Sequence, residues 1–324
     1  MSETTEALWY VAPGRAELRQ TALPPLLPGW VEIAATHSAL SRGTERLVLE
    51  GRVPQSEWQR MRAPMQEGDF PFPVKYGYAL VGEVVDGDPA RLGQPVFALA
   101  PHQRRLRLPG AAAMPIPDGV PPARATLAAN METALNAIWD AEIPPGSRVA
   151  IVGAGLLGCL IAALLSRQSD LELTMCDVLE ARRALASEFN VTFAFPTELA
   201  DDHVVVFHSS ATQAGLSTAL DALAFEGRVL ELSWFGDKAP QVPLGGAFHA
   251  RRLTIQCSQV GHVARPRRAA TTHRDRLARA LACLDDPRLD QLITGRLAFD
   301  RLADDIPRLL APRAPGIATV VEYL

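Results

Sequence analysis

Short apolar runs, punctuated by turn residues, make up the first part of the chain, up to about residue 118. Runs of this kind are typical of β-strands. They predict strands at 7–11, 17–21, 30–36, 80–85, 95–99 and 105–108. A dense group of prolines between residues 115 and 122 then predicts a boundary before a helical segment over 124–139. We therefore expect the chain to begin with a β-rich unit.

From residue 145 the rhythm changes, because short apolar runs now alternate with longer stretches of helical pattern. The apolar runs lie at 149–152, 171–175, 204–207, 229–232 and 253–256. Strands buried on both faces and separated by helices are typical of a parallel sheet with crossover helices. The sequence therefore predicts an α/β protein in which a β-rich part is joined to a doubly wound parallel sheet.

Composition narrows the class of protein. The chain has 324 residues, 48% of them hydrophobic, which is enough for two domains that each have a core. A net charge of -4 argues against nucleic-acid binding, which needs a basic surface. The four cysteines are scattered and form no Cys-x-x-Cys pair, so they suggest neither a structural zinc site nor a disulfide framework.

Two further patterns concern the surface and the location of the protein. No apolar run approaches the length that spans a bilayer, and the N-terminus lacks the pattern of a secretory signal, so we expect a cytoplasmic protein that does not bind membranes. An arginine-rich stretch leads into a helical pattern and is interpreted as a solvated helix face. Its members are Arg265, Arg267, Arg268, Arg274, Arg276 and Arg279.

The strongest motif is a glycine-rich loop in the stretch RVAIVGAGLLGCLIAALL. Gly153, Gly155 and Gly158 form Gly-x-Gly-x-x-Gly directly after a β-branched run and at the head of an apolar helical run, which is the context that a dinucleotide-binding loop requires. The amides of the helix start, with Leu156 and Leu157 in its first turn, would meet the phosphates. A methyltransferase can use a similar loop, so the motif alone does not establish hydride transfer.

An acidic residue at the end of the next run indicates which dinucleotide binds. Asp177 ends the run LELTMC, at the distance where this fold places the acid that bonds the adenosine ribose. A carboxylate there favours NAD over NADP, whereas Arg182 and Arg183 on the following helix would suit a 2′-phosphate. The alternative for Asp177 is a helix cap.

The chain as a whole resembles the medium-chain dehydrogenase/reductase superfamily, which includes alcohol dehydrogenases and quinone reductases. The matching stretches are WVEIAATHSALSRGTE, YGYALVGEVVDG, NMETALNAI and LITGRLAFDRLADDIPRLL. The resemblance implies a GroES-like β-rich catalytic domain, formed by 1–120 and 263–324, and a Rossmann domain over 121–262. It also implies a homodimer.

The resemblance breaks where the family binds its catalytic zinc. Arg42 falls where the family has a cysteine ligand, or Ser41 does if the register slips by one residue. Tyr78 and Ala79 replace the family's histidine and glutamate, and Ala129 lies near the third ligand. Arginine has no lone pair and alanine cannot coordinate a metal, so we predict no zinc site.

Without zinc, hydrogen-bond donors would have to stabilise charge on the reacting oxygen. Thr44 occupies the family's proton-relay position, Tyr78 carries a phenol, and Arg42 carries a permanent positive charge. These three residues form the catalytic hypothesis, and two such donors would supply much of what a metal provides. In the alternative reading, Tyr78 is a packing aromatic and Arg42 pairs with Glu45. Among zinc-less branches, Ser-x-Gly-Thr-Glu followed by Gly-Tyr is distantly similar to bacteriochlorophyllide hydroxyethyl dehydrogenases.

Two further groups complete the predicted site. The long segment 51–73 contains aromatic and sulfur side chains. Trp58 and Met61 are candidates for a wall that contacts the substrate, and the alternative is that they anchor a surface helix. Its Arg52, Arg60 and Arg62 would meet an anionic group. The resemblance puts four residues at the nicotinamide. Asn130 and Glu132 lie next to these residues, and Glu132 is a candidate for contact with substrate. The four are Thr133, Ser210, Trp234 and Phe235.

The predicted function is a zinc-independent, NAD-dependent oxidoreductase that acts on the secondary alcohol or ketone of a bulky or cyclic small molecule. An NADPH-dependent quinone or enone reductase is one alternative, and Asp177 argues against it. A nucleotide-binding pseudoenzyme is the other, and the retained Thr44 argues against that.

Overall fold

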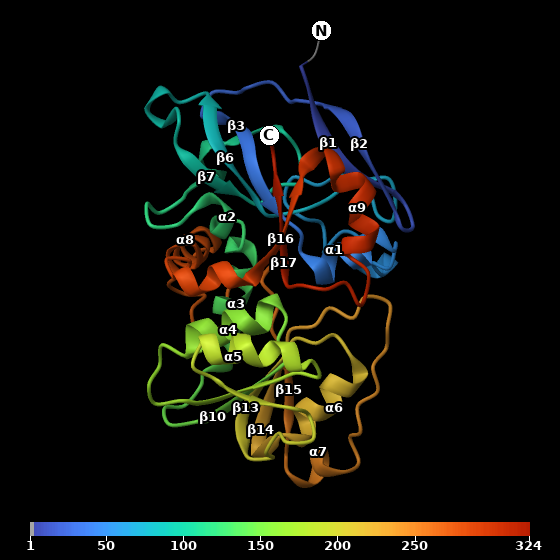
Figure 1. Ribbon diagram of the computed structural model, residues 1–324, viewed down its shortest axis with the longest axis vertical. Coiled ribbons are helices and arrows are strands. Elements are labelled where there is room, and N and C mark those ends of the chain that lie inside the picture. The colour runs from blue at the N-terminus through green and yellow to red at the C-terminus, as the bar shows by residue number, and fades with distance from the viewer. Residues whose placement is uncertain (1–2) are drawn as a thin grey trace. The chain divides into compact units, whose positions relative to one another are not determined.

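The computed structural model describes residues 3–324 and divides into two compact units (Figure 1). Unit 1 comprises Met1–Ala129 and Ile293–Leu324, and unit 2 comprises Asn130–Leu292. Residues 263–292 are predicted to belong to the catalytic domain, whereas their contacts group them with unit 2. The physical reason lies in the helix α8 (His273–Cys283), whose Arg276 side chain bonds residues of unit 2.

Unit 1 is built from two sheets whose strands are mostly antiparallel. The first has the strand order β2-β1-β5-β4, and the second has the order β16-β17-β3-β6-β7-β9, with β8 also paired to β3. The first sheet contains β1 (Thr4–Ala12), β2 (Arg15–Ala22), β4 (Glu67–Gly68) and β5 (Val74–Lys75). The second contains β3 (Trp30–Ala39), β6 (Leu80–Asp86), β7 (Pro95–Ala98), β8 (Arg105–Pro109), β9 (Met114–Pro115), β16 (Ile293–Ala298) and β17 (Ala318–Glu322).

Alternation of side chains along these strands produces the core of unit 1. Val31 and Ile33 of β3, Leu80 and Val84 of β6 and Leu106 of β8 are buried in one apolar cluster. Residues two apart on a strand face the same side, so each strand contributes one face to this cluster. The strands predicted between residues 7 and 108 are confirmed, with ends that match or differ by no more than three residues.

The helices of unit 1 are short. They are α1 (Arg42–Leu49), η1 (Gln55–Glu57), η2 (Pro89–Arg91), η3 (Gly110–Ala112), α2 (Pro122–Ala125), η6 (Phe299–Arg301) and α9 (Leu302–Leu309). The helix predicted over 124–139 is instead α2 followed by α3 (Ala128–Ala141). The helix α1 was not predicted, and it carries part of the site described below.

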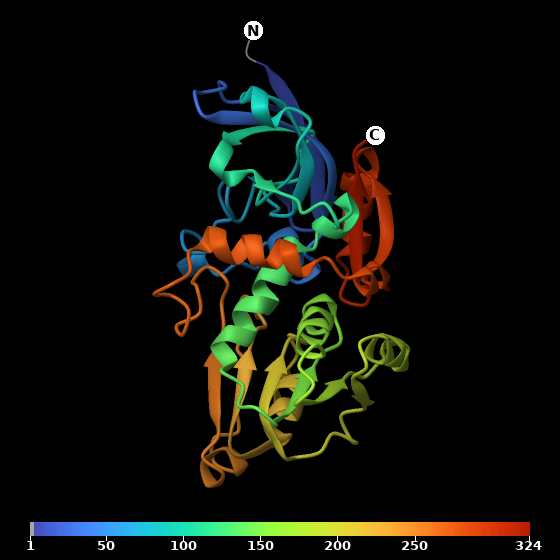
Figure 2. The same cartoon turned by 90° about the vertical axis from the view of Figure 1, so that its left-hand side faces the viewer.

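Unit 2 is a six-stranded parallel sheet with the strand order β12-β11-β10-β13-β14-β15. Helices α4 and α6 pack on its strands (Figure 2). The strands are β10 (Arg148–Val152), β11 (Glu172–Cys176), β12 (Thr192–Ala194), β13 (His203–His208), β14 (Leu223–Glu231) and β15 (Thr254–Cys257). Besides α3 and α8, its helices are α4 (Leu156–Leu165), η4 (Glu180–Arg182), α5 (Arg183–Glu188), α6 (Gln213–Asp221), α7 (Ala247–Ala250) and η5 (Pro287–Leu292).

The strand order of this sheet predicts where a ligand binds. The chain proceeds from β10 outward to β11 and β12, and then returns to the other side of β10 to form β13, β14 and β15. Open α/β sheets bind ligands at such a reversal, outside the carboxyl ends of the strands. The fold is therefore the predicted combination of a GroES-like β-rich unit with a Rossmann parallel sheet. Across residues 3–324, the structure contains no helix that is both long and apolar enough to cross a membrane.

Candidate functional site

The glycine-rich loop lies at the strand reversal, between β10 and α4. Gly153 has a φ of +107°, and a Cβ there would lie 2.8 Å from the backbone nitrogen of Ser210. A Cβ on Gly158 would lie 2.0 Å from the carbonyl oxygen of Gly153. Because neither position has room for a side chain, these two glycines let the helix and the β13 loop pack closely against the loop.

Gly155 is different, because a Cβ there would meet nothing within 4 Å. It is exposed and is the N-cap of α4, with no side chain that caps the helix. The first-turn residues Leu156 and Leu157 are partly exposed. The amides of an uncapped helix start need an acceptor, and an anion supplies one. An open backbone surface at a helix start therefore fits a dinucleotide pyrophosphate.

Two alanine substitutions separate these roles. Gly155→Ala is expected to keep the wild-type melting temperature but to lower dinucleotide affinity roughly tenfold, because its methyl group occupies the open approach to the loop. Gly158→Ala is expected to lose about 1 to 3 kcal/mol of stability, because its methyl group overlaps a carbonyl. Thermal unfolding with and without cofactor measures both effects. Equal dinucleotide affinity in Gly155→Ala and wild type would contradict the assignment of the loop.

Asp177 follows β11 and contacts the glycine-rich loop directly. Its carboxylate accepts the Ala154 N–H at 2.8 Å and the Leu179 N–H at 2.9 Å. The N-cap of η4 is Leu179, so Asp177 is not the cap residue of that helix. Arg182, at the end of η4, is partly buried. The neighbouring Arg183 bonds Glu180 at 2.7 Å and lies over an aromatic ring, that of Phe193, at 4.5 Å.

The residues predicted at the nicotinamide divide into two groups. Ser210 follows β13, and Trp234 and Phe235 follow β14, so these three lie at the carboxyl edge of the sheet and are partly exposed. Thr133 is partly exposed on α3. Glu132 is buried and accepts a hydrogen bond from the Arg276 Nε at 3.0 Å.

The arginine-rich stretch is solvent-exposed as predicted at five of its six arginines, and Arg276 is the exception. It is only 1% exposed. Its guanidinium donates to Glu132, to the Asn136 side chain at 2.6 Å and to the His262 carbonyl at 3.0 Å. Burial raises the pKa of Glu132, and the positive charge of Arg276 opposes that rise. These contacts support a structural role for Glu132 in unit 2, while its contact with substrate stays a prediction.

In unit 1 the structure brings three hydroxyl groups together. The Tyr78 phenol donates a hydrogen bond to Ser41 Oγ, and the Thr44 hydroxyl lies close enough to the phenol to lower its pKa. Ser41 is the N-cap of α1, and Thr44 lies in the first turn of that helix. Burial raises the pKa of Tyr78 to about 12, although the hydrogen bonds with Ser41 and Thr44 lower it. The phenol is therefore protonated at neutral pH, and Ser41 Oγ accepts its one proton.

Arg42 points to a different part of unit 1. Its guanidinium donates to the carbonyl oxygens of Ala314, Pro315 and Gly316, with distances of 2.5 to 3.2 Å. The side chain thus holds the loop that precedes β17. Of the two residues considered for the family's cysteine position, Ser41 accepts the hydrogen bond from Tyr78.

A buried polar network under α1 was not predicted. The Glu45 carboxylate is fully buried and accepts hydrogen bonds from the Tyr10 phenol and from the Ser41 backbone N–H, each at 2.6 Å. His102 Nε2 lies 3.0 Å from the same carboxylate, and His102 Nδ1 lies 2.7 Å from Ser38 Oγ. Burial raises the pKa of Tyr10 well above its usual value, and the charge of Glu45 adds to the rise. The network fixes the start of α1, and thereby Ser41.

A second missed cluster lies at the carboxyl edge of the sheet in unit 2. His208, the last residue of β13, is fully buried. Its Nδ1 lies 2.7 Å from a carboxylate oxygen of Glu231, the last residue of β14, and its Nε2 lies 2.7 Å from Ser210 Oγ. The sequence contains a signal for this pair, since both residues lie at the carboxyl ends of runs predicted as strands of one parallel sheet.

The segment 51–73 is held mainly by its own contacts. The Trp58 indole donates to the Val53 carbonyl at 3.0 Å, and Met61 is partly buried. Arg60 pairs with Glu57 at 2.6 Å, and Arg62 pairs with Asp69 at 2.5 Å. Both arginines are thus engaged with carboxylates, while the proposed contact with substrate stays a prediction for Trp58 and Met61.

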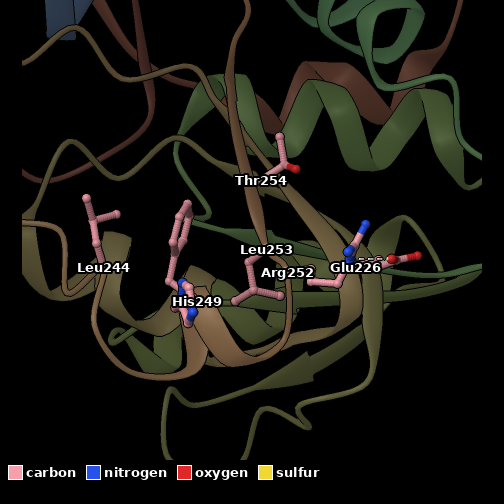
Figure 3. A pocket seen from close by; sticks show the side chains of 7 residues that line it. Glu226, Leu244, His249, Arg252, Leu253 and Thr254 are labelled. Atoms are coloured by element: carbon pink, nitrogen blue, oxygen red, sulfur yellow. Dashed lines mark ion pairs between the residues drawn. The ribbon is translucent and has the colours of Figure 1, made fainter.

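Two other features of the structure bear on ligands. Within the described residues 3–324, no three or more histidine, cysteine, aspartate or glutamate side chains are grouped so that they could hold a metal ion. A surface hollow of about 610 Å³ is lined by residues of β14, α7 and β15, among them Phe248 and His249 (Figure 3). An ion pair between Glu226 and Arg252 at 2.7 Å lies beside it. The hollow lies near the amino ends of the strands, opposite the glycine-rich loop.

Comparisons with known proteins support the fold. No family model matches the sequence, and a search of curated proteins finds no match. Among solved structures, the chain is similar to L-idonate 5-dehydrogenase from Escherichia coli K-12, with a TM-score of 0.79, 15% identity and 99% of both chains covered. It is similar to a zinc-binding dehydrogenase, so described, from Sinorhizobium meliloti 1021 bound to NADP, with a TM-score of 0.77, 16% identity and 99% of both chains covered.

A third structure has the same fold and a bound cofactor. It is described as a short chain alcohol dehydrogenase from E. coli CFT073 complexed with NADH, and it matches with a TM-score of 0.76 and 14% identity over 99% of this chain and 100% of that chain. At these identities the likeness establishes the shared fold.

Proposed function

We propose that this protein is a zinc-independent, NAD-dependent oxidoreductase that transfers a hydride between nicotinamide and a secondary alcohol or ketone of a bulky or cyclic small molecule. The main support for this proposal is the contact of the Tyr78 phenol with Ser41 and Thr44. In the family that the chain resembles, Tyr78 and Ser41 correspond to zinc ligands and Thr44 to the hydroxyl of the proton relay. Dehydrogenases with bound NADH or NADP among the similar structures support the general reaction class.

The hydroxyl cluster has the chemistry that the reaction needs. The nicotinamide, when bound, supplies the hydride acceptor or donor. The Tyr78 phenol has one proton, which it donates to Ser41 Oγ. In the reaction the phenol turns this proton toward the substrate oxygen as negative charge develops there, and the Ser41 hydroxyl rotates to donate to the phenol oxygen in its place. A positioned donor contributes roughly 3 to 4 kcal/mol to lowering the barrier, so two donors replace much of the effect of a metal.

Contacts around Asp177 support NAD as the preferred cofactor. The carboxylate is held beside the glycine-rich loop by the amides of Ala154 and Leu179, where its charge would repel a 2′-phosphate. Arg183 is engaged with Glu180 and Phe193. Of the two arginines suited to a 2′-phosphate, Arg183 is thus directed toward other groups.

A binding and activity screen tests the function. Thermal unfolding with NAD and with NADP is measured first. NAD at roughly 100 times its Kd stabilises the folded state by about 2.7 kcal/mol, which raises the melting temperature by several degrees. Secondary alcohols and ketones are then screened by the absorbance of the reduced cofactor, on protein whose metal content has been measured.

The outcomes separate the proposed function from its alternatives. NAD binding with alcohol oxidation in zinc-free protein is the expected result. A preference for NADPH with reduction of quinones or enones would favour the reductase alternative. Cofactor binding without turnover of any alcohol, ketone or enone would favour a pseudoenzyme. Activity that requires stoichiometric zinc would overturn the role given to Tyr78.

A further inference from the structure

The cluster of Ser210, His208 and Glu231 is a buried relay whose hydrogen-bond directions follow from its geometry. A carboxylate only accepts hydrogen bonds, so the Glu231 oxygen 2.7 Å from His208 Nδ1 requires the proton of the neutral imidazole to reside on Nδ1. His208 Nε2 then carries a lone pair and faces Ser210 Oγ at 2.7 Å. In this neutral form the Ser210 hydroxyl donates its proton to His208.

Because its one proton is donated to His208, Ser210 Oγ can only accept hydrogen bonds from its other neighbours. The Thr212 hydroxyl lies 3.0 Å from it and, because Thr212 Oγ1 already accepts the Gly215 N–H, is suited to donate. The Thr212 N–H approaches at 3.4 Å, near the long limit of a hydrogen bond. One lone pair of Ser210 Oγ is thus weakly engaged, on a residue that is partly exposed.

Ser210 also lies next to the dinucleotide loop. A Cβ on Gly153 would touch the Ser210 backbone at 2.8 Å, and the Ser209 hydroxyl donates to the Gly153 carbonyl at 3.0 Å. Dinucleotides bind across the strand reversal, with the adenosine on the side of the acid that follows the second strand. Here that side is β11 with Asp177, so β13 and β14 border the other half of the ligand.

We infer that Glu231 and His208 set Ser210 Oγ as the acceptor that recognises the carboxamide N–H of the nicotinamide. Ser210 is the contacting group, and His208 and Glu231 are positioning residues. This role rests on the proposed function, because it requires that a nicotinamide dinucleotide binds to unit 2.

The same geometry occurs in Ser-His-acid nucleophiles, but the surrounding amides do not support acyl transfer. An oxyanion needs free backbone N–H groups beside the serine. The Ala211 N–H donates to Ser233 Oγ at 3.0 Å, and the Thr212 N–H points to Ser210 Oγ itself. The relay therefore fits recognition of a donor better than attack on an ester.

Glu231→Gln tests the inference, because the structure determines how the new amide is oriented. The Ser233 N–H donates to Glu231 Oε1 at 2.8 Å, so the amide oxygen of the glutamine takes that place and its NH₂ faces His208 Nδ1. The imidazole proton then moves to Nε2 and donates to Ser210 Oγ. The Ser210 hydroxyl no longer donates to His208, so its O–H proton is free to point toward the ligand as a donor.

The measurement is the Kd for NAD and for its acetylpyridine analogue, in which a methyl group replaces the carboxamide NH₂. Wild type is expected to prefer NAD roughly tenfold, the worth of one hydrogen bond. Glu231→Gln and Ser210→Ala are both expected to lose that preference. Glu226→Gln is the matched control, since it makes the same change near the other end of β14, beside Arg252, and should keep the preference.

Each outcome decides a separate question. An NAD preference that is unchanged in both Glu231→Gln and Ser210→Ala would overturn the inference while leaving NAD binding intact. Absence of binding of either dinucleotide by wild type would overturn the proposed function, and the inference with it. If Glu231→Gln does not fold, the Kd values of Ser210→Ala alone test the inference. That substitution deletes the hydroxyl of a partly exposed residue and leaves the Glu231–His208 pair in place. Covalent labelling of Ser210 by a fluorophosphonate would also overturn the inference, in favour of a nucleophilic serine.

Discussion

A Tyr78→Phe variant is expected to lose roughly 100- to 1,000-fold in kcat/KM for the secondary alcohol that wild type oxidises, while its Kd for NAD stays unchanged. The substitution removes the hydroxyl that donates to Ser41 and keeps the ring, whose edge contact with Tyr76 has a centroid distance of 6.0 Å. Because the lost interaction is made with charge that develops during the reaction, kcat should fall more than KM rises.

Tyr76→Phe is the matched control for this variant. It deletes the same atom from the neighbouring tyrosine, which is buried and lies against Phe70 with a centroid distance of 5.8 Å. Its kcat/KM should stay within about threefold of wild type, since Tyr76 has no part in the proposed chemistry. Full activity in Tyr78→Phe would remove the phenol from the mechanism.

The pKa of Tyr78 gives this prediction a pH dependence. The phenol donates only while protonated, and its proton is lost as pH rises through about 12. Between roughly pH 6 and 9 the ratio of wild-type to Tyr78→Phe activity should therefore stay constant. A ratio that rises with pH within that window would indicate a phenolate that acts as a base, and a ratio that falls would indicate a donor that ionises much earlier than about pH 12.

Local patterns predicted the parts of the fold that depend on neighbouring residues. The run at 80–85 became β6 (Leu80–Asp86), and the glycine-rich loop lies between a strand and a helix as its motif requires. Both signals are complete within a few residues. The helix α1 was missed because it has eight residues and carries Gly43 near its start, which gives little helical pattern. The edge strand β12 has three residues and no visible alternation.

The parts of the site that were missed depend on residues far apart in sequence. Glu45 and His102 are 57 positions apart, and Glu132 and Arg276 are 144 apart. Neither pair produces a local pattern, since only the packing of distant elements brings the charges together. The choice between Ser41 and Arg42 likewise depended on the direction of side chains at the start of α1, which the sequence leaves open.

Replacing the buried Arg276 should have the largest effect on stability. Arg276→Met is expected to lower the free energy of unfolding by about 3 to 5 kcal/mol at pH 7, because the Glu132 carboxylate then stays buried without its cation. Arg279→Met, the same change on the exposed side of α8, should cost less than about 0.5 kcal/mol. Urea unfolding of both variants measures the difference.

Acidic pH should relieve part of this loss, and the sign follows from the pKa of Glu132. Burial already raises that pKa in the folded state, and removal of the opposing Arg276 charge raises it further. An acid whose folded-state pKa is raised favours folding below its unfolded pKa, and this contribution is lost as pH rises through the folded pKa. The deficit of Arg276→Met should therefore be largest at neutral pH and shrink as pH falls toward about 5.

Adding Glu132→Gln, which removes the charge, should recover stability at pH 7 and abolish the pH dependence of the deficit. A deficit that is equal at both pH values would show that lost packing of the arginine side chain, not the unpaired carboxylate, destabilises the variant.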